Sequence, residues 1–134
     1  MRLHAKEYFQ ITHDAQSGIL EIDWTERTAE MGDEAFKDAL QRLAGFAAEY
    51  GAHSLLVDVT RFRHHVGAEL GAWRGAEITP QYNRAGVRRF AYVFAPGADL
   101  PPSSEEAPEA YEGEDFATRF FDAEDEARAW VSDI

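Results

Sequence analysis

The spacing of apolar residues divides the chain into alternating strand-like and helix-like segments. Residues 18–24 alternate, with apolar Leu20, Ile22 and Trp24 on one face and acidic residues on the other, which predicts a half-buried strand. Residues 6–12 predict a strand with less regular alternation. The intervening HDAQSG is rich in turn formers, so the two strands are expected to form an antiparallel hairpin.

The clearest helix is predicted over residues 33–50. Its apolar stripe recurs every three or four residues, at Phe36, Leu40, Leu43, Ala47 and Tyr50. Asp33 is a suitable N-cap, and Gly51 is a suitable residue to end the helix. The branched apolar runs 54–59 and 90–95 each follow a helical segment, which predicts strands buried on both faces, as in a parallel sheet.

A weaker helix is predicted over residues 66–79, with Val66, Leu70 and Trp73 on its inner side. Pro80 is expected to end or kink it. Every fourth residue is a glycine, namely Gly67, Gly71 and Gly75. Each glycine in a helix interior lowers the stability of the helix by about 1 kcal/mol relative to alanine. The stripe indicates close packing of the helix on the sheet, or a contact surface with Trp73 and Arg74 beside it.

Residues 97–115 predict an acidic loop insertion, because they contain three prolines, two glycines and seven acidic residues. Residues 118–121 predict a short last strand. Asp122 is expected to cap a final helix whose apolar residues are Ala127, Trp130, Val131 and Ile134. The whole chain, residues 1–134, is expected to form one α/β domain. Its sheet is predicted to be mixed but mainly parallel, with an N-terminal antiparallel hairpin and three main helices.

Three segments resemble the SpoIIAA-like family, which belongs with STAS domains and is related in fold to CRAL-TRIO lipid-binding domains. They are the closing segment RFFDAEDEARAWV at 119–131, the strand LEIDWT at 20–25 and the strand LLVDVT at 55–60. The resemblance implies the fold and a partner- or ligand-binding role. In STAS proteins that antagonise anti-sigma factors, phosphorylation of a serine controls binding. The equivalent position here falls near Gly67 and Ala68, and residues 62–77 contain no serine or threonine, so that control is not expected.

Charge and composition exclude several function classes. The net charge is −12, and residues 97–134 hold two basic and twelve acidic residues, so nucleic-acid binding is not expected. No apolar run reaches the length of a membrane span, and the first ten residues lack the apolar core of a signal peptide, so a cytoplasmic location is expected. The chain has no cysteine, which excludes disulfides, thiolate metal sites and cysteine nucleophiles.

The candidate site lies where the parallel strands end, because ligands of open α/β sheets bind beyond the carboxyl ends of strands. The ligand- or partner-binding candidates are Asp58, Thr60, Arg61, Arg63, His64, His65, Gly67, Gly71, Trp73 and Arg74. Adjacent His64 and His65 are poorly spaced to share a metal, so neither a metal site nor a cofactor is expected. Asp58 could orient the His64 imidazole in an enzyme, but no serine lies in a nucleophile elbow, and we expect no enzymatic activity.

The sequence therefore predicts a non-enzymatic regulatory or protein-interaction module whose contact surface is the helix 66–79 and the loop before it. A homodimer through that helix or an edge strand is a further expectation. The alternative is a carrier of a small apolar molecule or lipid, with a cavity lined by Trp73, Phe62, Tyr82 and Phe94. The acidic loop is expected either to act as a charged solubilising segment or to close as a lid over Arg61, Arg63, His64 and His65.

Overall fold

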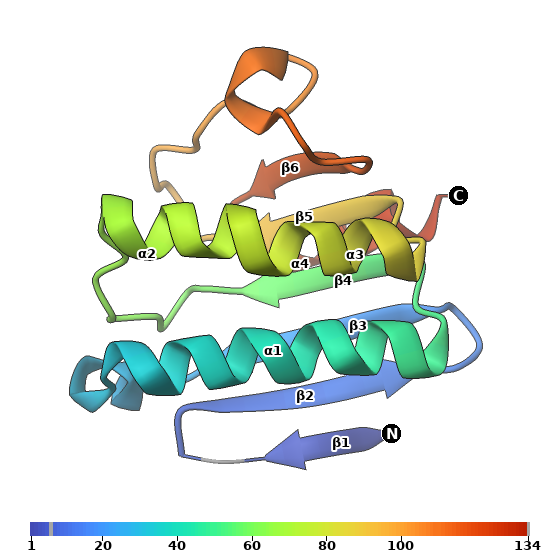
Figure 1. Cartoon of the computed structure of the whole chain (residues 1–134). Helices are drawn as coiled ribbons and strands as arrows, with labels where there is room; N and C mark the ends of the chain where they lie inside the picture. Colours follow the sequence, from blue (N-terminus) through green and yellow to red (C-terminus); the bar gives the residue numbers. More distant parts are fainter. Residues whose placement is uncertain (6, 134) are drawn as a thin grey trace.

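The computed structural model describes residues 1–5 and 7–133, which form one six-stranded sheet with helices on both faces (Figure 1). The strands lie in chain order across the sheet: β1 (Arg2–Ala5), β2 (Phe9–Asp14), β3 (Ile19–Trp24), β4 (Ser54–Asp58), β5 (Arg89–Val93) and β6 (Ala117–Phe121). The first three strands pair antiparallel, and β3 to β6 pair parallel. The predicted mixed, mainly parallel α/β sheet is confirmed.

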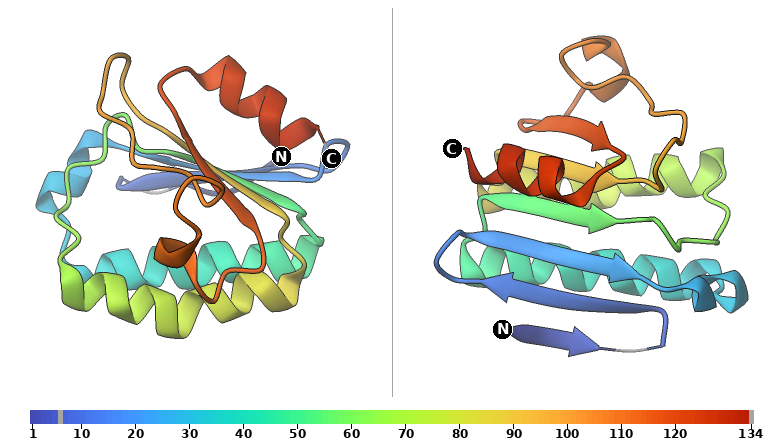
Figure 2. Two further views of the ribbon diagram at one scale, coloured as in Figure 1. Left: turned by 90° about the horizontal axis from the view of Figure 1, so that it is seen from above. Right: turned by 180° about the vertical axis from the view of Figure 1, so that it is seen from behind.

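The helices form two layers. Helix α1 (Asp33–Tyr50) and the helical run α2 (Ala68–Trp73), η2 (Arg74–Ile78) and α3 (Thr79–Ala85) cover one face of the sheet, and α4 (Glu124–Ser132) covers the other (Figure 2). We call these the front face and the back face. Right-handed crossovers from β3 to β4 and from β4 to β5 place α1 and the helical run on the same face, and α4 follows the last strand.

The main core lies between the front face and its helices, because alternate strand residues point toward α1 and α3. Leu20, Ile22 and Trp24 of β3 are buried there, as the alternation predicts, together with Leu55 of β4. A smaller core beneath α4 holds Ile19, Leu56, Ala91, Val93, Phe121, Ala127 and Val131. Strands β4 and β5 are therefore buried on both faces, which explains why their sequences are continuously apolar.

The N-terminal segment differs from the prediction of a single strand over residues 6–12. The chain forms two strands there, β1 and β2, and the edge strand is β1. A hydrogen bond links the start of β1 to the end of β2, because the His13 N–H donates to the Met1 carbonyl at 2.7 Å. Residue 6 lies outside the described part. The four residues of β1 are too few for their alternation to identify a strand.

The predicted helix over 66–79 is longer than expected and Pro80 does not end it. The run begins at Ala68 and reaches Ala85, where Gly86 ends it at φ +86°. Just before the proline the run widens to a π turn, in which the Thr79 N–H donates to the Arg74 carbonyl. Pro80 then occupies the first turn of α3, where its missing N–H costs least.

The helix ends also differ slightly from the prediction. Gly32, not Asp33, is the N-cap of α1, and Gly51 ends that helix at φ +63° as predicted. Ala123, not Asp122, precedes α4, and the Asp122 carboxylate instead accepts from the Gly97 N–H at 3.4 Å. Within residues 1–5 and 7–133, no helix has the length and apolar character required to cross a membrane.

Candidate functional site

A cavity of about 110 Å³ lies between the front face of the sheet and its two long helices. Its aromatic lining comes from β3, α1, the segment after β4, α3, β5 and the residue before β6: Trp24, Phe36, Phe62, Tyr82, Phe90, Tyr92 and Phe116. Aliphatic side chains complete the apolar part: Ile22, Leu40, Leu43, Val57, Val59 and Val66. An engineered apolar cavity of about 150 Å³ binds benzene, so this smaller space would hold at most a small ring.

The aromatic rings support one another through edge and stacking contacts. Trp24 stacks on Phe36 at 5.8 Å between ring centroids and meets Phe62 edge-on at 5.0 Å. Tyr82 meets Phe90 edge-on at 5.3 Å. Each such contact adds about 0.5–1.5 kcal/mol beyond burial. The aromatic side chains of the lining are therefore held by contacts with one another.

Arg74 and Glu114 place two opposite charges in the otherwise apolar lining. Arg74 comes from the π turn, and its Nη1 donates a long 3.5 Å hydrogen bond to the hydroxyl of Tyr92. Glu114 lies just before β6 and accepts from the Thr118 hydroxyl at 2.7 Å. Burial raises the pKa of Glu114, while the Thr118 hydrogen bond and the Arg74 charge act in the opposite direction.

Asn83 of α3 fixes the backbone on both sides of Glu114. Its Nδ2 donates to the Gly113 carbonyl at 2.7 Å, and its Oδ1 accepts from the Asp115 N–H at 2.9 Å. The loop is thus fastened to the helix at the residue that enters the cavity. This contact spans about thirty residues of sequence and is invisible to local pattern analysis.

Two further hydroxyls face the cavity without a protein partner. Tyr82 is 3% exposed and Thr79 is 8% exposed, and both line the space. Across residues 1–5 and 7–133, neither side-chain hydroxyl makes a hydrogen bond. Burial raises the pKa of Tyr82, so this phenol stays neutral and able to donate. Solvent reaches both hydroxyl oxygens, so a ligand could take the place of water on each of them.

The cavity continues into a second hollow of about 270 Å³ toward the carboxyl ends of the strands. The two spaces share Val59, Phe62, Arg74, Tyr92 and Glu114. Tyr111 and Phe94 line only the outer hollow. The charged pair therefore stands between an apolar interior and a wider opening.

The predicted site residues fall into separate groups in the structure, and only Arg74 lines the cavity. Asp58 accepts from the backbone and hydroxyl of Thr60, at 2.9 and 2.6 Å. Arg61 pairs with Glu26 at 3.4 Å, and the Arg63 N–H donates to the Thr28 hydroxyl at 2.7 Å. These contacts fix the segment after β4 onto the turn before α1.

The suggested pairing of His64 with Asp58 is wrong. His64 Nε2 lies 2.8 Å from an Asp33 carboxylate oxygen, and its ring stacks on Phe36 at 5.9 Å. The His65 ring lies beside Gly67 instead. In the described part of the chain, no three His, Asp or Glu side chains are placed to hold a metal ion.

The glycine stripe does not pack closely on the sheet. A Cβ added at Gly71 or Gly75 would meet no atom within 4 Å, so this side of the run is open. Trp73 packs against the core edge with Lys37 Nζ 5.3 Å from its ring centroid, and it does not line the cavity. Of the residues expected around a cavity, Phe62 and Tyr82 line it, and Phe94 lines the adjoining hollow.

The acidic loop does not close over Arg61, Arg63, His64 and His65. It turns toward the helix side and lies beside β6 and α3, where it includes the short helix η3 (Pro108–Tyr111) (Figures 1 and 2). The Ser104 N–H donates to the Thr118 carbonyl at 2.9 Å, and the Tyr111 hydroxyl donates to the Pro102 carbonyl at 2.5 Å. The loop therefore forms a wall of the two connected spaces.

A second polar cluster lies on the back face. Asp23 of β3 stands beside Asp58 of β4 in the parallel register, with Glu21 two residues away on the same face. Arg128 of α4 pairs with Glu21 at 2.5 Å. Burial, together with the neighbouring Glu21 and Asp58 carboxyls, raises the pKa of Asp23 to about 8.

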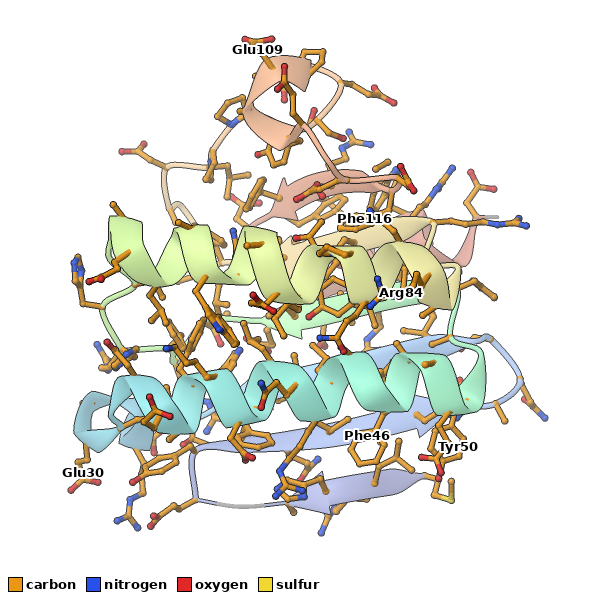
Figure 3. The ribbon with its side chains drawn as sticks, in the orientation of Figure 1. Glu30, Phe46, Tyr50, Arg84, Glu109 and Phe116 are labelled. Carbon is orange, nitrogen blue, oxygen red and sulfur yellow. The ribbon has the colours of Figure 1, made fainter. Side chains whose placement is uncertain are left out.

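Sequence reasoning missed Glu114 and Thr79 as site residues. Glu114 is one of seven acidic residues in the loop, and nothing in the local sequence distinguishes it. Thr79 precedes the proline that was expected to interrupt the helix. In the side-chain view Phe116 lies between α3 and β6, and Arg84 lies on the side of α3 that faces α1 (Figure 3). Comparisons of this chain with protein-family models, with curated proteins and with solved structures gave no match.

Proposed function

We propose that the protein binds a small, largely apolar molecule in the cavity between the sheet and the helical run. The observation that carries this proposal is a cavity of about 110 Å³ lined by seven aromatic side chains, one of which, Tyr82, has a hydroxyl with no protein partner among the described residues. Binding would remove apolar ligand surface from water and supply a hydrogen bond to this hydroxyl. This corresponds to the small-ligand alternative from the sequence.

The cavity supports binding without catalysis. Among the described residues that line it, there is no histidine and no serine, so a nucleophile activated by an imidazole is not provided. Arg74 and Glu114 can orient a ligand through charge-assisted hydrogen bonds. The function proposed is therefore recognition of a small molecule.

Titration with toluene tests the proposal. Toluene should raise the unfolding midpoint of the full chain in a concentration-dependent manner, because a ligand that binds only the folded state stabilises it. Val57→Phe fills the cavity from β4 and should abolish the shift, while Leu100→Phe, an enlargement at an exposed position, should retain it. Val57→Ile is the smaller filling change, used if the phenylalanine variant does not fold.

The result decides between binding in the cavity and weak surface association. Loss of the toluene effect in a folded Val57 variant, with retention in Leu100→Phe, supports the cavity. An equal toluene effect in wild type and in a folded Val57 variant would contradict it. Absence of any effect in the wild-type chain would also contradict it.

A regulatory or protein-interaction role and the SpoIIAA-like assignment stay proposals beside this one. The open side of the helical run at Gly71 and Gly75 is compatible with a contact surface, but no partner chemistry is indicated there. The family resemblance rests on segments 20–25, 55–60 and 119–131, which form β3, β4 and the β6–α4 unit. These are packing elements, and they support a fold more than an activity.

A further inference from the structure

The polar groups of the cavity restrict the chemistry of its ligand, provided that the proposed small-molecule binding holds. Arg74 can only donate hydrogen bonds, and an ionised Glu114 can only accept them. Both residues line the cavity and the outer hollow, and the Arg74 charge acts on the Glu114 carboxyl, so we place both beside the same part of a bound molecule. A complementary ligand needs an acceptor for Arg74 close to a donor for Glu114.

The two charges also disfavour a charged ligand. Across residues 1–5 and 7–133, no Arg74 nitrogen lies within 4.0 Å of a Glu114 oxygen, so the two side chains do not form an ion pair with each other. A carboxylate drawn to Arg74 would be repelled by Glu114, and an ammonium drawn to Glu114 would be repelled by Arg74. The chain's net charge of −12 adds a general cost for anions.

The remaining lining favours a flat apolar body. Trp24, Phe62 and Phe90 present ring faces and edges to the interior. The unpaired hydroxyls of Tyr82 and Thr79 can each donate or accept a hydrogen bond. They can therefore bond a polar group of the ligand in either orientation. A primary aromatic carboxamide is the simplest neutral group that combines ring surface with an acceptor next to a donor.

We propose that the cavity recognises a small aromatic carboxamide, with the ring among the aromatic walls, the carbonyl oxygen on Arg74 and the amide N–H on Glu114. The polar group would occupy the boundary between the cavity and the outer hollow. Asn83 holds Glu114 in place for this contact through the backbone of Gly113 and Asp115.

Four probes of nearly equal size test the proposal: benzamide, toluene, benzoate and benzylammonium. Each is titrated at neutral pH into the full wild-type chain, with binding followed by chemical shifts of the Leu40, Leu43 and Val57 methyl groups. Benzamide is expected to bind at least about tenfold more tightly than each of the other three, which corresponds to about 1.4 kcal/mol. Glu114→Ala should reduce the ratio of benzamide affinity to toluene affinity by most of this factor. Glu112→Ala, an exposed acid of the same loop, is the matched control and should change neither.

The outcomes separate this inference from the proposed function. Toluene binding without a benzamide preference overturns the carboxamide assignment and leaves the cavity function standing. A preference for benzoate or benzylammonium also overturns it, since one charge then dominates. A benzamide preference that survives Glu114→Ala overturns the role of Glu114. If none of the four probes binds, the cavity function and this inference fail together.

Discussion

Asn83 of α3 holds Glu114 at the cavity from thirty-one positions away in the sequence, by hydrogen bonds to the peptide groups on either side of it. The two residues belong to different structural units, a helix and the acidic loop. Because of these hydrogen bonds, Glu114 is held in the lining of the cavity as a polar side chain. The arrangement has consequences for stability, ligand binding and pH dependence.

Removal of the Asn83 side chain should loosen the loop and weaken binding. Asn83→Ala loses two hydrogen bonds, which should cost about 1–2 kcal/mol of unfolding free energy in urea denaturation. Benzamide affinity should fall while toluene affinity changes little. Gln81→Ala is the matched control, because the Gln81 amide donates only to the Glu77 carbonyl of its own helical run. Equal benzamide affinity in Asn83→Ala and wild type would contradict the role given to Asn83.

Benzamide binding should weaken on acidification. The pH midpoint of this change should lie above the midpoint that an exposed glutamate would give. Burial raises the pKa of Glu114, and protonation removes an acceptor for the ligand's amide N–H. The charged and titratable groups around it are Arg74, Tyr92 and Tyr111. A titration series across pH measures the effect, and Glu114→Gln should flatten it. The same pH midpoint in the Gln variant would assign the dependence to another group.

The back-face carboxyls should make the free energy of unfolding decrease as pH rises from about 4 to about 8. The folded pKa of Asp23 is raised to about 8, above its unfolded value of about 3.9. The folded chain therefore binds this proton more tightly, and its stability falls as pH rises between these two values. Asp23→Asn should remove that fall and stabilise the protein at pH 8 by on the order of 1 kcal/mol, after allowance for solvent screening.

Asp14 provides the control for this pH effect, because its shift has the opposite direction. Hydrogen bonds from the Gln16 and Ser17 N–H groups lower the pKa of Asp14, so its contribution is lost as pH falls. Asp14→Asn should therefore alter only the acid side of the stability profile. Urea unfolding at several pH values measures both variants. An unchanged slope between about pH 4 and about pH 8 in Asp23→Asn would show that the Asp23 carboxyl is ionised in the folded protein.

Two glycines should respond to alanine in opposite ways. Gly18 has φ +73°, and an added Cβ would collide with the His53 ring, so Gly18→Ala should destabilise the protein by about 1–3 kcal/mol. Gly75 lies in the helical run with open space around its Cα, so Gly75→Ala should stabilise it by about 0.5–1 kcal/mol. Thermal or urea unfolding compares the two. Destabilisation by Gly75→Ala would indicate that the glycine stripe is packed after all.

The sequence predicts the elements whose periodicity is strong and local. Helix α1 follows directly from its apolar stripe, and β3 from its alternation. The continuation of the second helical run past Pro80 depends on a π turn, which local rules do not anticipate. The cavity residues Phe62 and Tyr82 could be named in advance because they are aromatic and follow the right elements. Glu114 could not, since its position depends on a contact with Asn83 across the fold.

The most direct test of the account is the location of a bound ring by nuclear Overhauser effects between toluene protons and protein methyl groups. The account predicts contacts to Leu40, Leu43 and Val57, which line the cavity. It predicts no contacts to Leu56 or Val131, which belong to the separate core beneath α4. Contacts to that second core, or to exposed Leu100 alone, would contradict binding between the sheet and the helical run.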